Sequence, residues 1–263
     1  MRSGAPDLTG RTLLAVFAHP DDESIACGGL LTLCAEQGAR VILLCATRGD
    51  HGGGTLDPDI TSALRALRTT ELAAAAAVLG IADVQFLDYR DAYLQATNWD
   101  LISADIEAVI VRERPDVVVT FGEDGLYWHP DHIVVHHATT DAVERIGPSG
   151  PALYYVTMPK GAIRTLVDTL RPRLADGDVP QVLGVTDADA FGVLAKPPTL
   201  VVDVGRVAAR KLAALRCHRS QADGPLLVMR DDEAAALLGI EHFRRAPVGA
   251  EGDSFLDRLA AIG

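Results

Sequence analysis

Short apolar runs alternate with helix-forming segments through the first half of the chain, and this alternation limits the folds open to it. The apolar runs have the length of buried strands and cover residues 12–18, 40–46, 84–87 and 116–121. The segments between them favour helices and cover residues 23–37, 61–79 and 99–114. Continuous apolar strands are typical of a sheet covered on both faces, and this strand–helix order gives parallel strands with right-handed crossovers. We therefore expect an α/β, Rossmann-like, mostly parallel sheet with helices on both faces.

The second half of the chain alternates less clearly. We expect helices at residues 131–146, 160–171, 206–217 and 231–239. We expect strands at residues 153–156, 182–185 and 199–204, and a C-terminal tail after the last helix. Because no repeat, low-complexity segment or change of composition divides the sequence, residues 1–263 are predicted to form a single domain.

Composition and charge narrow the classes of function. The net charge of −12 argues against a nucleic-acid or anionic-membrane binder, which would need a basic face. No stretch approaches the length of a membrane span, and the first apolar run is too short for a secretory signal. The four cysteines show no C-x-x-C spacing and are expected to be small buried hydrophobes in a reducing compartment. We expect a cytoplasmic protein, and a homo-oligomer is possible.

The stretch Ala18-His19-Pro20-Asp21-Asp22-Glu23 directly follows the first apolar run, at the predicted carboxyl edge of the sheet, where ligands bind in such folds. His19 and Asp22 are three residues apart, so a tight turn can aim both at one point, with Asp21 beside it. An imidazole and two carboxylates at one point suit a metal ion and its water. Alternatively, the two aspartates cap the helix and His19 is merely buried.

A second polar cluster, His129-Pro130-Asp131-His132, follows the strand predicted at residues 116–121. Because both clusters follow central strands, we expect them at the same edge of the sheet. His132 can supply a third metal ligand, while His129 can face a bound substrate without binding the metal. Asp131 is placed to orient a histidine by accepting its ring proton.

Other aromatic and imidazole side chains have alternative interpretations. His136 lies one helical turn after His132, but no Glu follows His132 as in H-E-x-x-H, so we expect His136 to pack against the sheet. His51 and His242 are expected at the surface. Trp128 could offer an aromatic face to a sugar ring or an aglycone, or could anchor the loop 122–128 in the core.

The two His-Pro-Asp clusters together closely resemble the LmbE-like, or PIG-L, family of zinc-dependent N-deacetylases. That family includes deacetylases of N-acetylglucosaminyl phosphatidylinositol, of mycothiol and bacillithiol precursors, and of glycopeptide antibiotic pseudoaglycones. Arg68-Thr69-Thr70-Glu71 looks like the family's R-x-x-E helix, and Phe86-Leu87-Asp88-Tyr89-Arg90-Asp91 is similar to its next strand and loop. The segment from Lys211 to Gln221 looks like its K…H-x-S-Q segment.

The resemblance implies one zinc ion per chain, held by His19, Asp22 and His132, with Asp21 as the general base; other divalent metals such as Fe²⁺ are possible. Three protein ligands leave a fourth position open, which is typical of a catalytic zinc site. Zinc lowers the pKa of water from about 15.7 toward about 7, and Asp21 can take the proton that is released.

The resemblance also implies roles for residues around the metal. His129 would stabilise the oxyanion or act as an acid, and Asp131 would tune His129. Arg68 and Asp91 would contact hydroxyl groups of the substrate. Alternatively, Arg68 pairs with Glu71 at i,i+3 on a solvated helix face.

These observations predict a metal-dependent hydrolase that removes the N-acetyl group from a small amino-sugar conjugate of the N-acetylglucosamine type. A zinc-dependent amidase for another small acetamide is an alternative. So is a non-catalytic metal-binding module, although such a module would not need Asp21 and His129. A Rossmann-type cofactor binder is disfavoured because Gly28-Gly29 is not part of a G-x-G-x-x-G pattern and the acidic cluster would repel a pyrophosphate.

Overall fold

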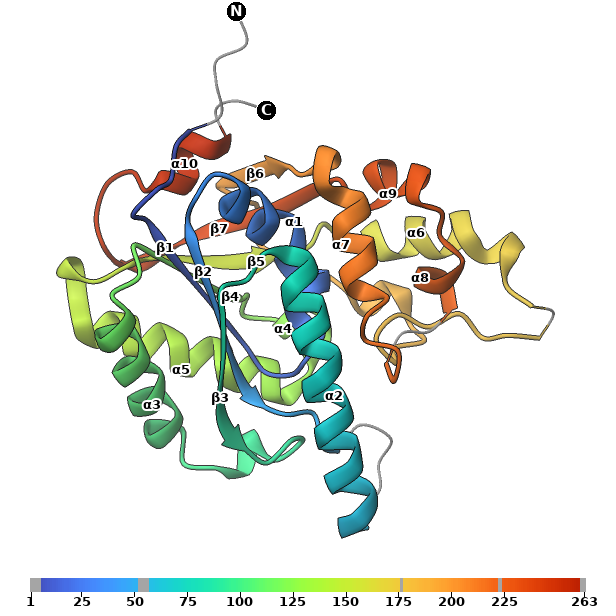
Figure 1. The fold of residues 1–263 in the computed structure, drawn as a ribbon, viewed down its shortest axis with the longest axis horizontal. Helices are drawn as coiled ribbons and strands as arrows, with labels where there is room; N and C mark the ends of the chain where they lie inside the picture. Colours follow the sequence, from blue (N-terminus) through green and yellow to red (C-terminus); the bar gives the residue numbers. More distant parts are fainter. Residues whose placement is uncertain (1–5, 52–56, 176, 222–223, 261–263) are drawn as a thin grey trace, which may run out of the picture.

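A seven-stranded sheet forms the centre of the computed structural model, which describes residues 6–51, 57–175, 177–221 and 224–260 (Figure 1). The strands are β1 (Thr12–Phe17), β2 (Arg40–Thr47), β3 (Asp83–Tyr89), β4 (Val117–Phe121), β5 (Ala152–Thr157), β6 (Leu200–Asp203) and β7 (Ile240–Gly249). Their order is β3-β2-β1-β4-β5-β7-β6. The first five are parallel, and β7 runs antiparallel between β5 and β6. The predicted α/β, mostly parallel sheet is confirmed.

Helices cover both faces of this sheet (Figure 1). Their bounds are α1 (Asp22–Glu36), α2 (Pro58–Leu79), α3 (Trp99–Glu113), α4 (Gly125–Trp128), α5 (Pro130–Ile146), α6 (Ala162–Leu170), α7 (Ala208–Leu215), α8 (Gly224–Val228), α9 (Asp231–Leu238) and α10 (Phe255–Ala260). Helices α3 and α5 pack together on one face, and α1, α2 and α7 pack together on the other. A second, smaller core lies among α6, α7, α8 and α9.

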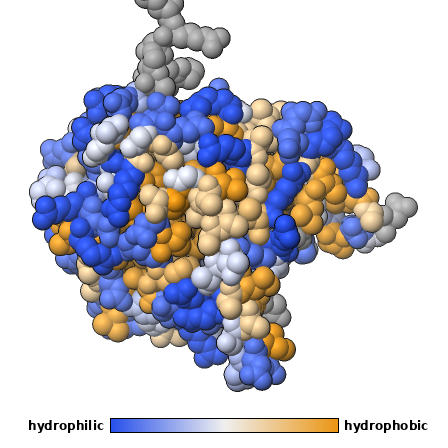
Figure 2. All heavy atoms as spheres, viewed as in Figure 1, coloured by the Kyte–Doolittle hydropathy of each residue, from blue (hydrophilic) through white to orange (hydrophobic). Residues whose placement is uncertain are grey.

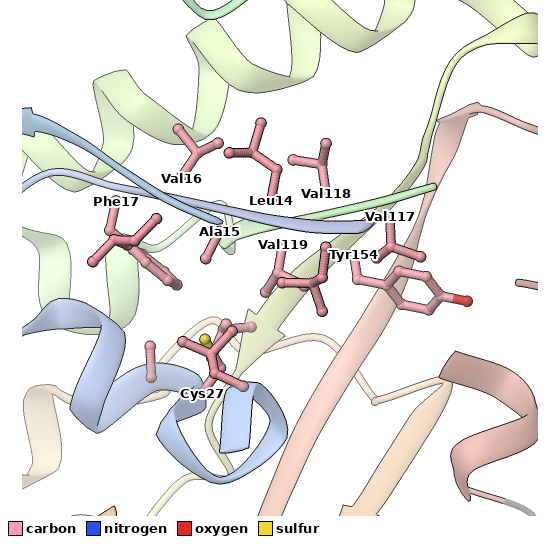
Figure 3. Close-up of a cluster of buried hydrophobic side chains, with 14 of the residues drawn as sticks. Leu14, Ala15, Val16, Phe17, Cys27, Val117, Val118, Val119 and Tyr154 are labelled. Atoms are coloured by element: carbon pink, nitrogen blue, oxygen red, sulfur yellow. The ribbon is translucent and has the colours of Figure 1, made fainter. Parts of the chain in front are cut away.

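The two central strands explain why the sequence predicted a sheet covered on both faces. In Figure 3, Leu14, Val16 and Val118 point toward α5, whereas Ala15 and Val119 point toward α1. Leu14 pairs with Val118 and Ala15 with Val119, and all of these side chains are buried. Because each face of β1 and β4 meets a helix, apolar side chains point to both faces along residues 13–17 and 117–119, and no polar alternation is left.

Two predictions for the second half were wrong. Residues 182–185 form a tight hairpin with one isolated bridge between Val182 and Val185, and they lie outside the sheet. The predicted C-terminal tail contains β7, which pairs with two strands. Strand β7 was missed because buried Glu241 and the adjacent Arg244 and Arg245 interrupt the apolar pattern that marks a strand.

Helix α1 is interrupted at Cys27, whose φ of −151° is not helical. The carboxylate of Glu241 from β7 accepts hydrogen bonds from the backbone N–H groups of Gly29 and Leu30, both at 2.8 Å, and so caps the second part of the helix. Lys211 Nζ lies 2.7 Å from the same carboxylate and neutralises it. The buried Glu241 therefore has a structural role in restarting α1.

The surface in Figure 2 has hydrophilic side chains spread between smaller apolar areas over the face shown. Within the described ranges, no helix combines the length and the apolar character that crossing a membrane requires.

Candidate functional site

The two polar clusters of the sequence meet at the carboxyl ends of β1 and β4. These strands are parallel neighbours, so the turn after Phe17 and the turn after Phe121 lie at the same edge of the sheet. His19 lies in the first turn, and His132 lies in the first turn of α5, beyond α4. The predicted position of the site at this edge is confirmed.

Three potential metal ligands converge at this edge. His19 Nδ1 lies 3.2 Å from His132 Nε2 and 3.5 Å from Asp22 Oδ2, while His132 Nε2 lies 3.2 Å from Asp22 Oδ1. Tetrahedral ligands at zinc bond lengths are about 3.3 Å apart, since the edge of a tetrahedron is roughly 1.6 times the bond of about 2.0–2.1 Å. The spacing of these donors therefore fits a tetrahedral metal.

Hydrogen bonds on the far side of each imidazole fix a ring proton there, so in the neutral ring the converging nitrogen is the one that can bind a metal. His19 Nε2 lies 3.0 Å from Asp91 Oδ1 and 3.3 Å from Asp131 Oδ2, and carboxylates only accept hydrogen bonds, so the ring proton is on Nε2. His132 Nδ1 donates to the carbonyl of Gly125 at 3.0 Å for the same reason. Such partners fix the tautomer that a metal ligand needs.

The charges around His19 favour a cation. Burial by itself lowers the pKa of His19, but the carboxylates of Asp131, Asp22 and Asp91 raise it well above its usual value. Burial likewise opposes ionisation of Asp22, yet His132 and His19 hold the pKa of that carboxyl well below its usual range. A divalent metal ion would supply the positive charge that these carboxylates favour.

In the described part of the chain, two other groups of three residues have potential ligand atoms within 4.8 Å of one another: His19 with His129 and His132, and His19 with Asp91 and Asp131. In the first group, His129 Nδ1 already accepts a hydrogen bond from the backbone N–H of Asp131 at 3.2 Å. The second group faces His19 Nε2, which carries the ring proton. His19, Asp22 and His132 are therefore the set whose lone pairs point at one another.

Asp21 lies beside this set in an unusual backbone conformation. Its φ of 116° and ψ of −28° are rare for a residue other than glycine, and such strain is often found at active sites. Its Oδ2 lies 3.1 Å from Arg68 Nη2, so its side chain does not cap α1. Burial raises the pKa of Asp21 to about 6, although the positive charge of Arg68 opposes this shift. The interpretation of Asp21 as a simple helix cap is wrong.

Arg68 is buried beside Asp21 and does not lie on a solvated helix face. Its guanidinium donates to the carbonyls of Gly49 at 3.1 Å and Pro20 at 2.7 Å, in addition to its contact with Asp21. Its Nε is buried and has no hydrogen-bond partner among the described residues. Glu71 does not pair with Arg68, as the alternative interpretation required, but accepts hydrogen bonds from the N–H and Oγ of Ser220.

The Asp131 carboxylate contacts the ring of His19 and not the ring of His129. Because His129 Nδ1 accepts the N–H of Asp131, the ring proton of a neutral His129 is on Nε2. Burial and the neighbouring His132 and His19 rings lower the pKa of His129 to about 4. The Asp131 carboxylate contacts His19 and accepts from the N–H groups of Ala92 and Leu94, so it acts on His129 only through its charge.

A cavity of about 320 Å³ lies beside the converging ligands. Predicted site residues on its wall are His19, Asp21, Arg68, Asp91 and His129. The sequence missed its other lining residues, which are His51, Ala92, Tyr127, Leu183, Gly184, Val185 and Gln221. A larger cavity of about 600 Å³ includes Arg11 and Asp116, at the amino ends of β1 and β4. It holds none of the predicted site residues, so we assign the smaller cavity to the site.

The remaining candidates have clear positions. Asp91 uses Oδ1 on His19, and its Oδ2 accepts the backbone N–H of His51 at 2.8 Å, so His51 belongs to the cavity and not to the open surface. Trp128 is 45% exposed, which excludes a role as a core anchor. His136 Nδ1 donates to the carbonyl of Phe121 at 2.9 Å. The sequence also offers the polar segment 47–54 after β2 as a loop that could line the site; its residues 52–54 lie outside the described part of the chain.

Comparison with known proteins gives relatives over most of the chain. Residues 14–143 match the family described as "PIG-L: GlcNAc-PI de-N-acetylase". The 1D-myo-inositol 2-acetamido-2-deoxy-alpha-D-glucopyranoside deacetylase of Acidothermus cellulolyticus is 35% identical over 89% of this chain and 88% of its own. The protein of the same name from Streptomyces griseus is 33% identical over 97% of this chain and 90% of its own.

Solved structures share the fold. The N,N'-diacetylchitobiose deacetylase of Pyrococcus horikoshii aligns with a TM-score of 0.62 and 23% identity, over 90% of this chain and 84% of its own. The 4-carboxy-2-hydroxymuconate hydratase of Pseudomonas putida also has a TM-score of 0.62, with 18% identity over 92% of this chain and 99% of its own. Because two different reactions occur on this fold, the fold alone does not identify the reaction.

Proposed function

The chain belongs to the PIG-L family, and from this membership and the geometry of its site we propose that it is a metal-dependent N-deacetylase. Its reaction is the hydrolysis of the acetamide of an N-acetylglucosamine-type conjugate. The observation that carries the proposal is the convergence of His19 Nδ1, Asp22 and His132 Nε2 at distances of 3.2–3.5 Å beside a cavity that contains Asp21. A hydratase-type reaction has no comparable support, since the relatives above 30% identity are named as deacetylases.

His19, Asp22 and His132 would hold one divalent metal ion, for which we propose zinc. When bound, the metal supplies a Lewis acid for the amide carbonyl and lowers the pKa of water. Asp91 and Asp131 hold the ring of His19, and the Gly125 carbonyl holds the ring of His132. These contacts keep both imidazoles in the tautomer that binds metal.

Asp21 is the proposed general base. Its carboxylate borders the cavity and, among the described residues, accepts one hydrogen bond, from Arg68, which leaves lone pairs for an attacking water molecule. As Asp21 takes a proton from that water, the Arg68 charge remains beside it. The proton can then pass from Asp21 to the amine that leaves.

His129 is the proposed oxyanion donor. Its Nδ1 is held by the first turn of α5, so its Nε2–H is the group available to the substrate. A neutral donor fixed by the backbone needs no rearrangement when negative charge develops on the carbonyl oxygen. We propose that Arg68 and Asp91 contact sugar hydroxyls, because both residues line the same cavity.

For the substrate we propose an α-glycoside of N-acetylglucosamine with a polar aglycone such as myo-inositol, the compound in the names of the 35% and 33% identical relatives. A cavity of about 320 Å³ lies at the lower end of the range for small-ligand sites. It suits one sugar ring at the metal, and we propose that the aglycone extends toward Leu183 and Val185, which also line the cavity.

The proposal is tested by measuring acetate and free amine released from a panel of substrates by the zinc-loaded protein. The panel contains N-acetylglucosaminyl inositol, N,N'-diacetylchitobiose, free N-acetylglucosamine and a simple acetamide. We expect the inositol glycoside to have the highest kcat/KM. Absence of acetate release from every sugar by fully zinc-loaded protein would contradict the deacetylase proposal.

A further inference from the structure

Glu23 is fully buried and connects the backbone of Asp21 to a distant histidine. Its Oε2 accepts the backbone N–H of Asp21 at 3.0 Å. Its Oε1 lies 2.9 Å from His218 Nε2 and accepts the hydroxyl of Ser24. Glu23 is not among the proposed metal ligands, and it does not line the cavity. Its contacts therefore act on the turn that carries Asp21.

This turn needs support because Asp21 is held against its intrinsic preference. An aspartate at a helix N-cap usually folds back so that its carboxylate accepts a backbone N–H of the first turn. With φ at 116°, Asp21 makes no such bond, and its carboxylate points to Arg68 and the cavity. When the Asp21 carboxylate points into the cavity, where it could act as a base, it cannot also cap α1.

Two buried groups hold Asp21 from opposite ends. Arg68 contacts its carboxylate and the carbonyl of Pro20 before it, while Glu23 accepts its N–H. Arg68 comes from α2, whereas Glu23 is in turn fixed by His218 from the segment after α7. Helices packed on the same face of the sheet therefore meet at the turn after β1.

The side chain of His218 has one hydrogen-bond partner among the described residues, which is Glu23. The histidine is 2% exposed, and its Nδ1 has no hydrogen-bond partner among the described residues. Its Nε2–H therefore donates to Glu23, since a carboxylate only accepts. The same segment is fastened to α2 through the two hydrogen bonds from Ser220 to Glu71, at 2.8 and 2.6 Å. The segment 218–220 thus bridges α1 and α2 behind the site.

We propose that Glu23 and His218 are positioning residues, which hold the Asp21 backbone in the conformation that directs its carboxylate toward the substrate. The inference rests on the proposed function, because it assumes that Asp21 is the base. It requires no contact of either residue with substrate or metal.

A double-mutant cycle tests this inference. Glu23→Gln should lower kcat on N-acetylglucosaminyl inositol by about 10- to 100-fold, which is the effect of losing one charge-assisted hydrogen bond. The zinc content and KM should change by less than about twofold. In an Asp21→Asn background, the same substitution should have almost no further effect on the remaining turnover, because there is no base left to position.

Two further variants separate positioning from general stability. His218→Gln keeps an N–H donor near the Nε2 position and should retain most of the turnover, whereas His218→Leu should resemble Glu23→Gln. Glu241→Gln is the matched control, because it alters another buried carboxylate that accepts backbone N–H groups of α1. It should lower stability but leave kcat per bound zinc unchanged.

A crystal structure of Glu23→Gln gives a readout that does not depend on activity. The inference predicts that Asp21 leaves φ near 116° or that its contact with Arg68 breaks. An unchanged Asp21, or an equal loss of turnover in the Asp21→Asn background, would overturn it. If the wild-type protein released no acetate, the proposed function would fail, and the conformation of Asp21 in this variant would still decide the positioning role.

Discussion

Replacement of Gly49 by alanine should disable the base without touching a metal ligand. Gly49 has a φ of 69°, and a Cβ added there would lie 2.4 Å from Cζ of Arg68. The guanidinium must therefore move away from the carbonyl of Gly49 and from Asp21. The matched control is Gly10→Ala, where φ is 81° and a Cβ would meet nothing within 4 Å among the described residues.

The sizes of the two effects follow from these geometries. Alanine in the left-handed region costs about 1–2 kcal/mol, so both variants should lose about that much unfolding free energy. Only Gly49→Ala also breaks the 3.1 Å contact between Arg68 and Asp21. Loss of one charge-assisted hydrogen bond costs about 1.5–3 kcal/mol, which corresponds to a fall in turnover of about 10- to 150-fold.

The assay measures kcat for acetate release, zinc content and urea unfolding for both variants and the wild-type protein. We expect one zinc per chain in all three proteins and a large fall in kcat only for Gly49→Ala. A kcat within twofold of that of Gly10→Ala would refute the argument that Arg68 holds the base.

Three further predictions follow from the site and its surroundings. His132→Ala should reduce the zinc content far below one per chain, and unchanged stoichiometry would remove His132 from the ligand set. His129→Ala should lower kcat by about 10²–10³-fold with a smaller change in KM, whereas an effect on KM alone would make it a binding residue. Glu23 raises the pKa of His218 although burial opposes this, so the stability from this pair is present below about pH 6.5 and is lost as pH rises through the higher folded value. His218→Gln should therefore destabilise the protein more at pH 6 than at pH 9 in urea unfolding, and an equal loss at both would exclude this ion pair.

The parallel half of the sheet was predictable because its strands are buried on both faces. Strands β1, β2 and β4 each contain a run of consecutive apolar residues, and each strand is followed or preceded by a helix with clear stop signals. The antiparallel part was not predictable from the same signal. Strand β7 carries a buried Glu241 that serves α1, so a charged residue interrupts its inward-facing apolar positions.

The convergence of His19, Asp22 and His132 was predictable because topology alone brings the ends of β1 and β4 together. The partners behind these ligands were predictable only in part. The sequence placed Asp131 where it could orient a histidine, but the contact of His19 with Asp91 depends on the path of the loop after β3. The left-handed backbone of Asp21 was equally hidden, because sequence spacing does not report φ. The cavity wall from residues 183–185 comes from a hairpin that resembles a strand in sequence.

The central claim is that one divalent metal at His19, Asp22 and His132 is required for the removal of an N-acetyl group. It is tested most directly by adding Zn²⁺ stepwise to metal-free protein while acetate release from N-acetylglucosaminyl inositol is recorded. We expect no release without metal, and a rate that rises linearly and stops rising at one zinc per chain. Full activity in the metal-free protein, or no acetate after full zinc loading, would contradict the claim.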